Sequence, residues 1–149
     1  MTANEEARPT PLTIDFAKSG GLVPAIIQHR ATGEVLMLGF MNTQSLAETQ
    51  RSGQVTFFSR SRNQLWKKGE SSGHVLQVRE ILTDCDADAL LIRVDPVGPG
   101  VCHEGYRSCF FRRLENSVST SANEPISATI IAEKTFDPAT VYSASQEKK

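Results

Sequence analysis

The first half of the chain alternates between apolar runs and polar turns. Residues 22–41, LVPAIIQHRATGEVLMLGFM, hold two apolar runs on either side of residues 31–34, which predicts a β-hairpin. The segment that follows, NTQSLAETQRSG, predicts a short helix with Asn42 as N-cap and Gly53 as C-terminal stop. Leu46 then lies on the inner face of this helix.

The middle of the chain predicts further strands. Residues 54–61, QVTFFSRS, are rich in β-branched and aromatic side chains, whereas residues 60–73 are polar, basic and typical of turns. Residues 74–84, HVLQVREILTD, alternate as a long strand does, and residues 89–95, ALLIRVD, predict a buried strand. In the long strand we expect one side to carry Val75, Gln77, Arg79 and Ile81.

These elements predict an α+β fold that is mainly antiparallel β, with one or two short helices in a single domain. A length of 149 residues suits one domain with a sizeable core. Residues 1–10 predict a disordered N-terminal lead-in and residues 11–115 the folded domain. Residues 116–149 are rich in Ser, Thr and Ala and predict a variable C-terminal tail, with one short β segment at ISATIIAE.

Charge and hydropathy exclude several classes of partner. The formal net charge is -1, so no global attraction toward nucleic acid or an anionic membrane is expected. No apolar run is long enough to cross a bilayer, and the polar start MTANEEARPTP lacks the apolar core of a secretory signal. We therefore expect a cytoplasmic protein.

The stretch DCDAD, residues 84–88, places three carboxylates at alternating positions. On a straight strand they would share one face but span about 13 Å, too far for one Mg²⁺ with ligands at about 2.1 Å. The segment must therefore bend, or wrap an ion as a loop. An EF-hand is excluded because Ala89 and Asp95 stand where that loop needs glycine and glutamate. A solvated acidic turn remains the alternative, although it gives Cys85 no role.

The three cysteines are Cys85, Cys102 and Cys109, an odd number that argues against a disulfide framework. Cys102 and Cys109 are too far apart on a helix and face opposite ways on a strand, so only a loop that bends at Gly105 brings them to one ion. Three thiolates match catalytic zinc, with a fourth position left for water. A structural site closed by His103, or three unconnected cysteines, remain alternatives; in the catalytic case His103 is a candidate base.

Three blocks together resemble the phosphoribosyl-AMP cyclohydrolase family of histidine biosynthesis. The blocks are SRSRNQLWKKGESSGH, DCDADALL and GPGVCHEGYRSCFFR, in that order. The resemblance covers roughly residues 22–114, and the two ends of the chain do not align. It implies the third step of the pathway, which is the hydrolytic opening of the N1–C6 bond of N1-(5-phosphoribosyl)-AMP to the phosphoribosyl-formimino imidazole carboxamide ribotide.

The resemblance also implies the ligands of two metal ions. Cys85, Cys102 and Cys109 look like the zinc ligands, while Asp84, Asp86 and Asp88 look like the magnesium ligands. It further implies an intertwined homodimer whose zinc sites take cysteines from both chains. A small nucleotide substrate is expected, with no nucleic-acid or membrane partner.

Proton carriers and phosphate ligands follow from the same chemistry. His103 and His74 are the candidate proton carriers for attack by zinc-activated water on C6 and departure of N1. The candidate substrate-binding residues lie in the basic block: Arg60, Arg62, Trp66, Lys68, Ser71, Ser72 and Gly73. Solvated cations and a core tryptophan are the alternatives for that block.

Two rival functions use part of the same residues. A nucleobase deaminase also attacks an amidine carbon with zinc-activated water, but its H-x-E and P-C-x-x-C signatures are absent from this sequence. A zinc-stabilised, non-enzymatic binding domain would need a fourth ligand and would not need the three aspartates.

Overall fold

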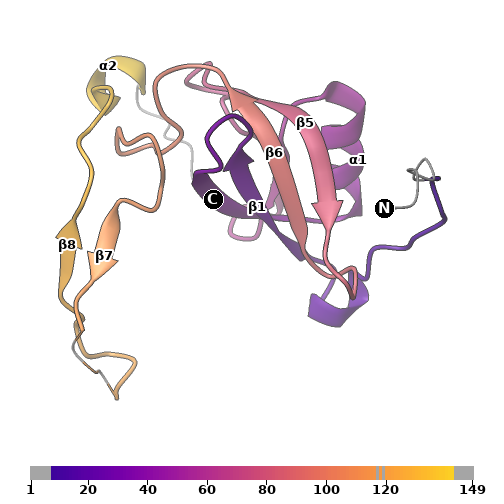
Figure 1. Cartoon of the computed structure of the whole chain (residues 1–149), viewed down its shortest axis with the longest axis horizontal. Coiled ribbons are helices and arrows are strands. Elements are labelled where there is room, and N and C mark those ends of the chain that lie inside the picture. Colours follow the sequence, from indigo (N-terminus) through magenta and orange to yellow (C-terminus); the bar gives the residue numbers. More distant parts are fainter. Residues whose placement is uncertain (1–7, 117, 119, 143–149) are drawn as a thin grey trace, which may run out of the picture.

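The computed structural model describes residues 8–116, 118 and 120–142 (Figure 1). Its centre is a four-stranded sheet in the order β2-β1-β6-β5. The strands are β1 (Val23–His29), β2 (Val35–Met41), β5 (Leu76–Thr83) and β6 (Leu90–Pro96). β1 pairs antiparallel with β2 and parallel with β6, and β5 pairs antiparallel with β6. The prediction of a mainly antiparallel α+β domain is confirmed.

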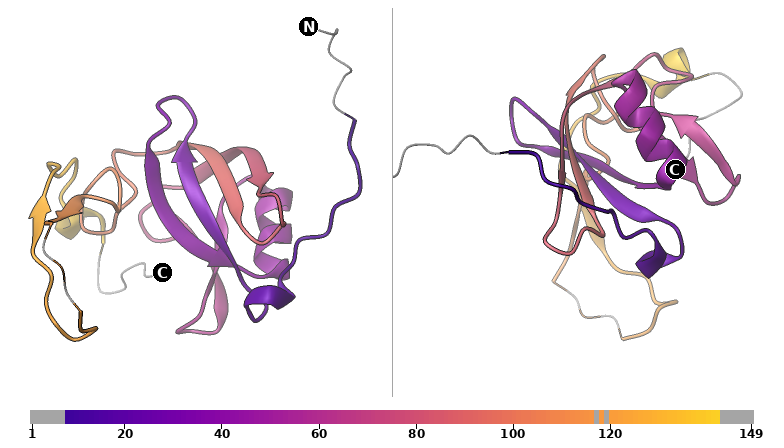
Figure 2. Two further views of the ribbon diagram at one scale, coloured as in Figure 1. Left: turned by 60° about the horizontal axis from the view of Figure 1, so that its bottom comes forward. Right: turned by 90° about the vertical axis from the view of Figure 1, so that its right-hand side faces the viewer.

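Helix α1 (Thr43–Ser52) and the hairpin of β3 (Thr56–Ser59) and β4 (Gln64–Lys67) form a second layer on one face of the sheet (Figure 2). Alternate residues of the sheet strands point toward this layer, because side chains in a strand alternate between its two faces. The fully buried core includes Ile27 and Ile92 from the sheet and Phe57 from the hairpin.

The residues that begin and end α1 are the ones that the sequence predicted. The Asn42 side chain accepts a hydrogen bond from the Ser45 N–H at 2.8 Å, and the Ser45 hydroxyl accepts one from the Asn42 N–H at 2.8 Å. Gly53 ends the helix with a left-handed φ of 71°. Leu46 packs against the core, so the predicted cap, stop and inner face are all confirmed.

Two strand predictions were incomplete. The stretch 60–73 was expected to be turn-like, but β4 lies within it and pairs with β3. In β5 the register shifts between Val78 and Glu80, so the expected common side is interrupted. Val78 and Ile81 therefore both pack against the core despite their odd spacing, because a bulge adds one residue to one strand.

The other face of the sheet, here called the outer face, carries an apolar row across all four strands. Ile26 of β1 is the direct neighbour of Leu38 in β2 and of Leu91 in β6, and Leu91 is in turn paired with Leu82 of β5. Ile26 and Leu82 are 36% and 38% exposed. A continuous apolar row open to solvent is typical of a surface that contacts another protein.

The chain after residue 110 folds back along the loop that follows β6. β7 (Arg112–Leu114) pairs with β8 (Ala128–Ile130), which lies in the predicted ISATIIAE segment, and α2 (Pro138–Val141) follows. We call residues 128–142 the C-terminal segment. Within the predicted lead-in, residues 1–7 lie outside the described part, as do residues 143–149 of the predicted tail.

Among the described residues, no helix has the length and apolar composition needed to cross a bilayer. The cytoplasmic location stays a prediction.

Candidate metal centre and substrate cavity

The acidic loop, residues 84–88, connects β5 to β6 as a tight turn rather than a straight strand. One carboxylate oxygen of Asp84 accepts hydrogen bonds from the backbone N–H groups of Asp88 at 3.0 Å and Ala89 at 3.2 Å. Ala87 has a left-handed φ of 59°, which turns the chain back. As a result, carboxylate oxygens of Asp84, Asp86 and Asp88 lie within 4.8 Å of one another. The bent-loop interpretation is confirmed, and the cluster is a possible metal site.

A lysine ammonium group already lies against this cluster. Lys18 is the middle residue of the 3-10 helix η1 (Ala17–Ser19). Its ammonium group lies 2.8 Å from a carboxylate oxygen of Asp86 and 2.7 Å from one of Asp88. Hydrogen bonding to Asp86 raises the pKa of Lys18, and hydrogen bonding from Lys18 lowers the pKa of Asp86 to about 2. For Asp88, the hydrogen bond from Lys18 lowers the pKa, but Asp86, Asp84 and burial together outweigh it and leave the pKa raised. The loop therefore attracts cations, which fits a hard metal ion.

The thiol loop, residues 102–109, folds back on itself. The Cys102 N–H donates to the Tyr106 carbonyl at 3.0 Å, and Gly105, with φ of 98°, makes the bend that the sequence predicted. The Cys109 N–H donates to the Leu36 carbonyl at 2.7 Å, which fixes the second cysteine against β2. The side chains of Cys102 and Cys109 are hydrogen-bonded to each other.

The environment of Cys102 favours the thiolate. The hydrogen bond from Cys109 is the largest cause that lowers the pKa of Cys102 to about 6, against an opposing contribution from burial. A thiolate is the form that binds metal, so this pair fits a soft ion such as zinc.

Cys85 does not join this pair within one chain. It is exposed on the acidic loop, before the start of β6, whereas Cys102 is buried after the end of β6. The strand between them spans about 20 Å at the usual rise per residue. Among the described residues, the three aspartates form the one cluster of metal-ligand type, and the three thiols form none.

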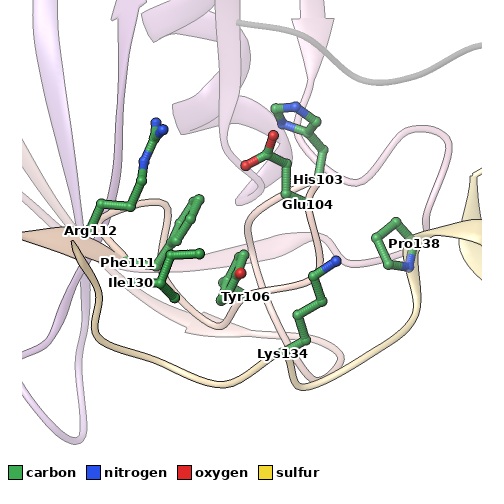
Figure 3. A pocket seen from close by; sticks show the side chains of 8 residues that line it. All are labelled: His103, Glu104, Tyr106, Phe111, Arg112, Ile130, Lys134 and Pro138. Carbon is green, nitrogen blue, oxygen red and sulfur yellow. The ribbon is translucent and has the colours of Figure 1, made fainter. Parts of the chain in front are cut away.

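A cavity of about 500 Å³ opens beside the thiol loop (Figure 3). His103 and Glu104 lie at one side of it, and Arg112 and Lys134 approach from elsewhere in the chain. The remaining wall is formed by Tyr106, Phe111, Ile130 and Pro138. His103 is thus next to a buried thiol and faces a space large enough for a ligand, as a proton carrier must.

His74, the second candidate proton carrier, has different surroundings. Its ring packs edge-on against Phe136 of the C-terminal segment, with centroids 5.1 Å apart. A side chain at Gly98 would meet that ring at 2.4 Å. Nδ1 of His74 is buried and has no hydrogen-bond partner in the described part of the chain. His74 does not line the cavity that holds His103.

The predicted substrate-binding block is divided between the surface and the core. Trp66 is only 4% exposed and packs on Phe57 with ring centroids 5.2 Å apart, while Lys68 is only 3% exposed. Arg60 lies over the Phe40 ring at 4.0 Å. Arg60 and Trp66 share a second cavity, of about 200 Å³, whose wall has no residue in common with that of the first.

The rest of that block forms local turns. The backbone N–H of Arg62 donates to the Ser59 hydroxyl at 3.3 Å, and the N–H of His74 donates to the Ser72 hydroxyl at 3.1 Å. Ser71 is exposed, and Gly73 has a left-handed φ of 77°. In one chain, none of these described groups lies in the wall of the cavity beside His103.

Four features of the site had no clear signal in the sequence. Lys18 is 68 residues from Asp86, and Lys134 comes from a segment predicted to be a variable tail. Arg112 and the Tyr106–Phe111 pair lie in or next to the second cysteine motif. Their closeness to this motif in the sequence was the one indication that they belong to the site.

Fold and site together define a small α+β protein with a candidate metal centre. The family model for phosphoribosyl-AMP cyclohydrolase matches residues 37–111. A curated phosphoribosyl-AMP cyclohydrolase of Solibacter usitatus (strain Ellin6076) is 54% identical over 131 residues, which is 88% of this chain and 97% of that protein. Its counterpart in Geobacter sulfurreducens is 53% identical, over 88% of this chain and 98% of that protein. The chain belongs to the phosphoribosyl-AMP cyclohydrolase family.

Proposed function

We propose that this protein is a phosphoribosyl-AMP cyclohydrolase, which hydrolyses the N1–C6 bond of the adenine ring in N1-(5-phosphoribosyl)-AMP during histidine biosynthesis. The observation that carries the proposal is the Cys102–Cys109 pair, with its lowered pKa, beside His103 in a cavity of about 500 Å³. The family membership supports the same reaction.

Zinc is the metal that the thiol loop suits. Cys102 and Cys109 would supply two thiolate ligands, and Cys85 the third. Zinc with three protein ligands and an open position supplies a water molecule of lowered pKa near neutral pH. The chain's own contribution would be to hold the purine in the cavity beside the thiol loop.

The third thiol must then come from a second chain. Cys85 lies beyond one end of β6 and the thiol pair beyond the other. In a dimer that meets through the outer face, a twofold axis near the middle of β6 would bring the start of one β6 toward the end of the other. The apolar row Leu38, Ile26, Leu91 and Leu82 supplies the surface for such a contact.

Proton transfers fall to histidine in this scheme. His103 faces the cavity beside the thiols, so it is placed to take a proton from the attacking water and to return one to N1. His74 lies against Phe136 outside that cavity. In the dimer, His74 is the second candidate proton carrier. Its alternative role is to position the C-terminal segment through Phe136.

Magnesium and the basic block would contribute to binding of the nucleotide. Asp84, Asp86 and Asp88 offer converging oxygens to a hard cation, which could bridge to a substrate phosphate. Arg60 and Trp66 share one cavity, and residues 68–73 form the adjoining loop; together they remain the proposed binding block for the nucleotide. The proposal for this block requires the dimer to bring it to a second chain's thiol loop.

The direct test is ultraviolet absorbance during incubation of the purified protein with N1-(5-phosphoribosyl)-AMP. We expect conversion of the closed purine spectrum to that of the opened imidazole carboxamide. A zinc chelator should abolish the change, and added zinc should restore it. If zinc-loaded protein leaves the purine spectrum unchanged, the assignment is wrong, and a zinc-stabilised binding domain takes its place.

A further inference from the structure

We propose that the C-terminal segment is part of the substrate site, and that Lys134 binds one of the two phosphates of the substrate. This inference rests on the proposed cyclohydrolase function, because it takes the two phosphates from the substrate of that reaction. It gives a binding role to a region that the sequence predicted to be a variable tail.

Lys134 and Arg112 are the two cations in the wall of the cavity beside the thiol loop. Neither makes an ion pair with any carboxylate in the part of the chain that the structure describes. Arg107, by contrast, is held by Glu34 at 2.7 Å and lies outside this wall. Two uncompensated cations at one cavity favour an anionic ligand.

An aromatic stack holds the two cations apart. Tyr106 and Phe111 lie face to face, with centroids 3.8 Å apart and planes inclined by 6°. The Lys134 ammonium group is 5.9 Å from the centre of the Tyr106 ring, and the Arg112 guanidinium is 5.1 Å from the centre of the Phe111 ring. Since the facing sides of the rings cover each other, the cations lie toward the two ends of the stack, as Figure 3 shows.

The arrangement matches the shape of the substrate. N1-(5-phosphoribosyl)-AMP carries a phosphoribosyl group at N1 and another at the opposite side of the purine, so its two phosphates point away from each other. Cations on opposite sides of a central cavity can therefore engage different phosphates. Glu104 is the one acidic group in this wall, and it lies on the His103 side in Figure 3.

Backbone hydrogen bonds fix Lys134 at this place. On one side of it, the Ile131 N–H donates to the Phe111 carbonyl at 2.9 Å, and on the other the Thr135 N–H donates to the Gly105 carbonyl at 2.8 Å. Both acceptors belong to the thiol loop or its immediate continuation. The lysine is therefore tied to the same loop that carries Cys102 and Cys109, rather than to a separate part of the surface.

Glycines in the loop allow the segment to approach this closely. A side chain at Gly100 would meet the Phe136 ring at 2.9 Å, and one at Gly105 would meet the Phe136 carbonyl at 2.6 Å. Because Gly105 also has a left-handed φ of 98°, it makes the bend between the cysteines and accepts the C-terminal segment at the same point. The C-terminal segment thus packs directly on the thiol loop.

The test compares Lys134→Gln with Arg113→Gln in the zinc-loaded protein. Arg113 is the matched control, since it is an exposed cation on β7 that lies outside the cavity wall. Loss of one charge-assisted hydrogen bond should raise KM about tenfold to a hundredfold, with kcat changed less than about threefold. Lys134→Arg should recover most of the affinity, and Arg113→Gln should behave as the unmodified protein does.

Calorimetry separates phosphate binding from a structural effect. AMP and ribose 5-phosphate represent the two halves of the substrate, with adenosine and ribose as their phosphate-free counterparts. Lys134→Gln should weaken binding of AMP or of ribose 5-phosphate and leave both phosphate-free ligands unchanged. Equal weakening of adenosine, or a KM equal to that of the unmodified protein, would overturn the phosphate role. If the unmodified zinc protein does not open the purine at all, it is the cyclohydrolase assignment that fails.

Discussion

The acidic loop and the thiol loop lie at opposite ends of β6, and both gather groups that bind metal ions. The acidic loop is exposed, and its carboxylates already hold the ammonium group of Lys18. The thiol loop is partly buried, with Cys102, Gly105 and Tyr106 inside. It is held by backbone hydrogen bonds to β2 and the C-terminal segment, and the pKa of Cys102 is lowered to about 6.

The two loops differ in how far a single chain arranges their potential metal-binding groups. In the thiol loop, the side chains of Cys102 and Cys109 are in contact, and this contact lowers the pKa of Cys102 to about 6. The acidic loop carries the third thiol, Cys85, which is exposed and belongs to no cluster of metal-ligand type among the described residues. The difference is understandable if each loop is completed by the opposite loop of a second chain.

The largest expected effect comes from dividing the cysteines between two chains. Cys85→Ser or Cys102→Ser alone should lose zinc and reduce activity more than about a thousandfold. When the two variants are unfolded, mixed and refolded together, half of the dimers contain one chain of each kind, and each such dimer has one intact site. Activity should return to about a quarter of the unmodified level. No recovery, with mixed dimers present, would place each site within a single chain.

The next effect concerns the outer face. Ile26→Asp puts a charge in the middle of the apolar row, where Leu38 and Leu91 are its direct neighbours. Because the residue is 36% exposed, the isolated fold should tolerate it. Light scattering should show a monomer, and zinc content should fall together with activity. Gln28→Asp, on the same face near the end of β1, serves as a milder control. A dimeric, fully active Ile26→Asp protein would contradict the proposed interface.

A smaller effect should be seen in the ionisation of the thiol loop. In metal-free protein, ultraviolet thiolate absorbance should titrate with a midpoint near pH 6, since the Cys109 hydrogen bond lowers the pKa of Cys102. Because zinc binds the thiolate form, zinc affinity should fall as the pH drops through that midpoint. Cys109→Ala removes the main cause and should move the midpoint upward, toward the ordinary range of cysteine. An unchanged midpoint in this variant would show that another group stabilises the thiolate.

The smallest effect concerns Lys18. Lys18→Met removes the ammonium group that competes for Asp86 and Asp88. Exposed ion pairs are weak, so affinity for Mg²⁺ or Mn²⁺ should rise only about twofold to tenfold, as measured by calorimetry. Asp86→Asn should lower that affinity and serves as the opposite control. A loss of affinity in Lys18→Met would mean that the lysine arranges the carboxylates instead of competing with the ion.

Local chemistry explains how much of the fold the sequence could predict. Asn42 and Gly53 marked the ends of α1, and Gly105 marked the bend between the cysteines, because each acts on residues a few positions away. β4 was missed because it is only four residues long and lies within a polar, basic stretch. It pairs with β3 through the backbone. The bulge near Arg79 was missed because an alternating pattern carries no sign of one extra residue.

The candidate site was predictable only where its parts are close in sequence. The three aspartates do converge, and Cys102 does meet Cys109. The contact of Lys18 with Asp86 and the packing of Phe136 on His74 join residues far apart along the chain. No periodicity or spacing in the sequence predicts such contacts, because only the complete fold brings these residues together.

The placement of the two loops gives β6 a role that its apolar sequence does not suggest. If each zinc ion joins the acidic loop of one chain to the thiol loop of the other, the length of β6 sets the distance between the two loops. Its buried side chains could exchange among apolar types of similar volume with little cost, about 1.5 kcal/mol or less. An insertion or deletion of two residues would keep every side chain on its face yet displace one loop by about 6.6 Å. Evolution in this family should therefore be freer with the composition of β6 than with its length.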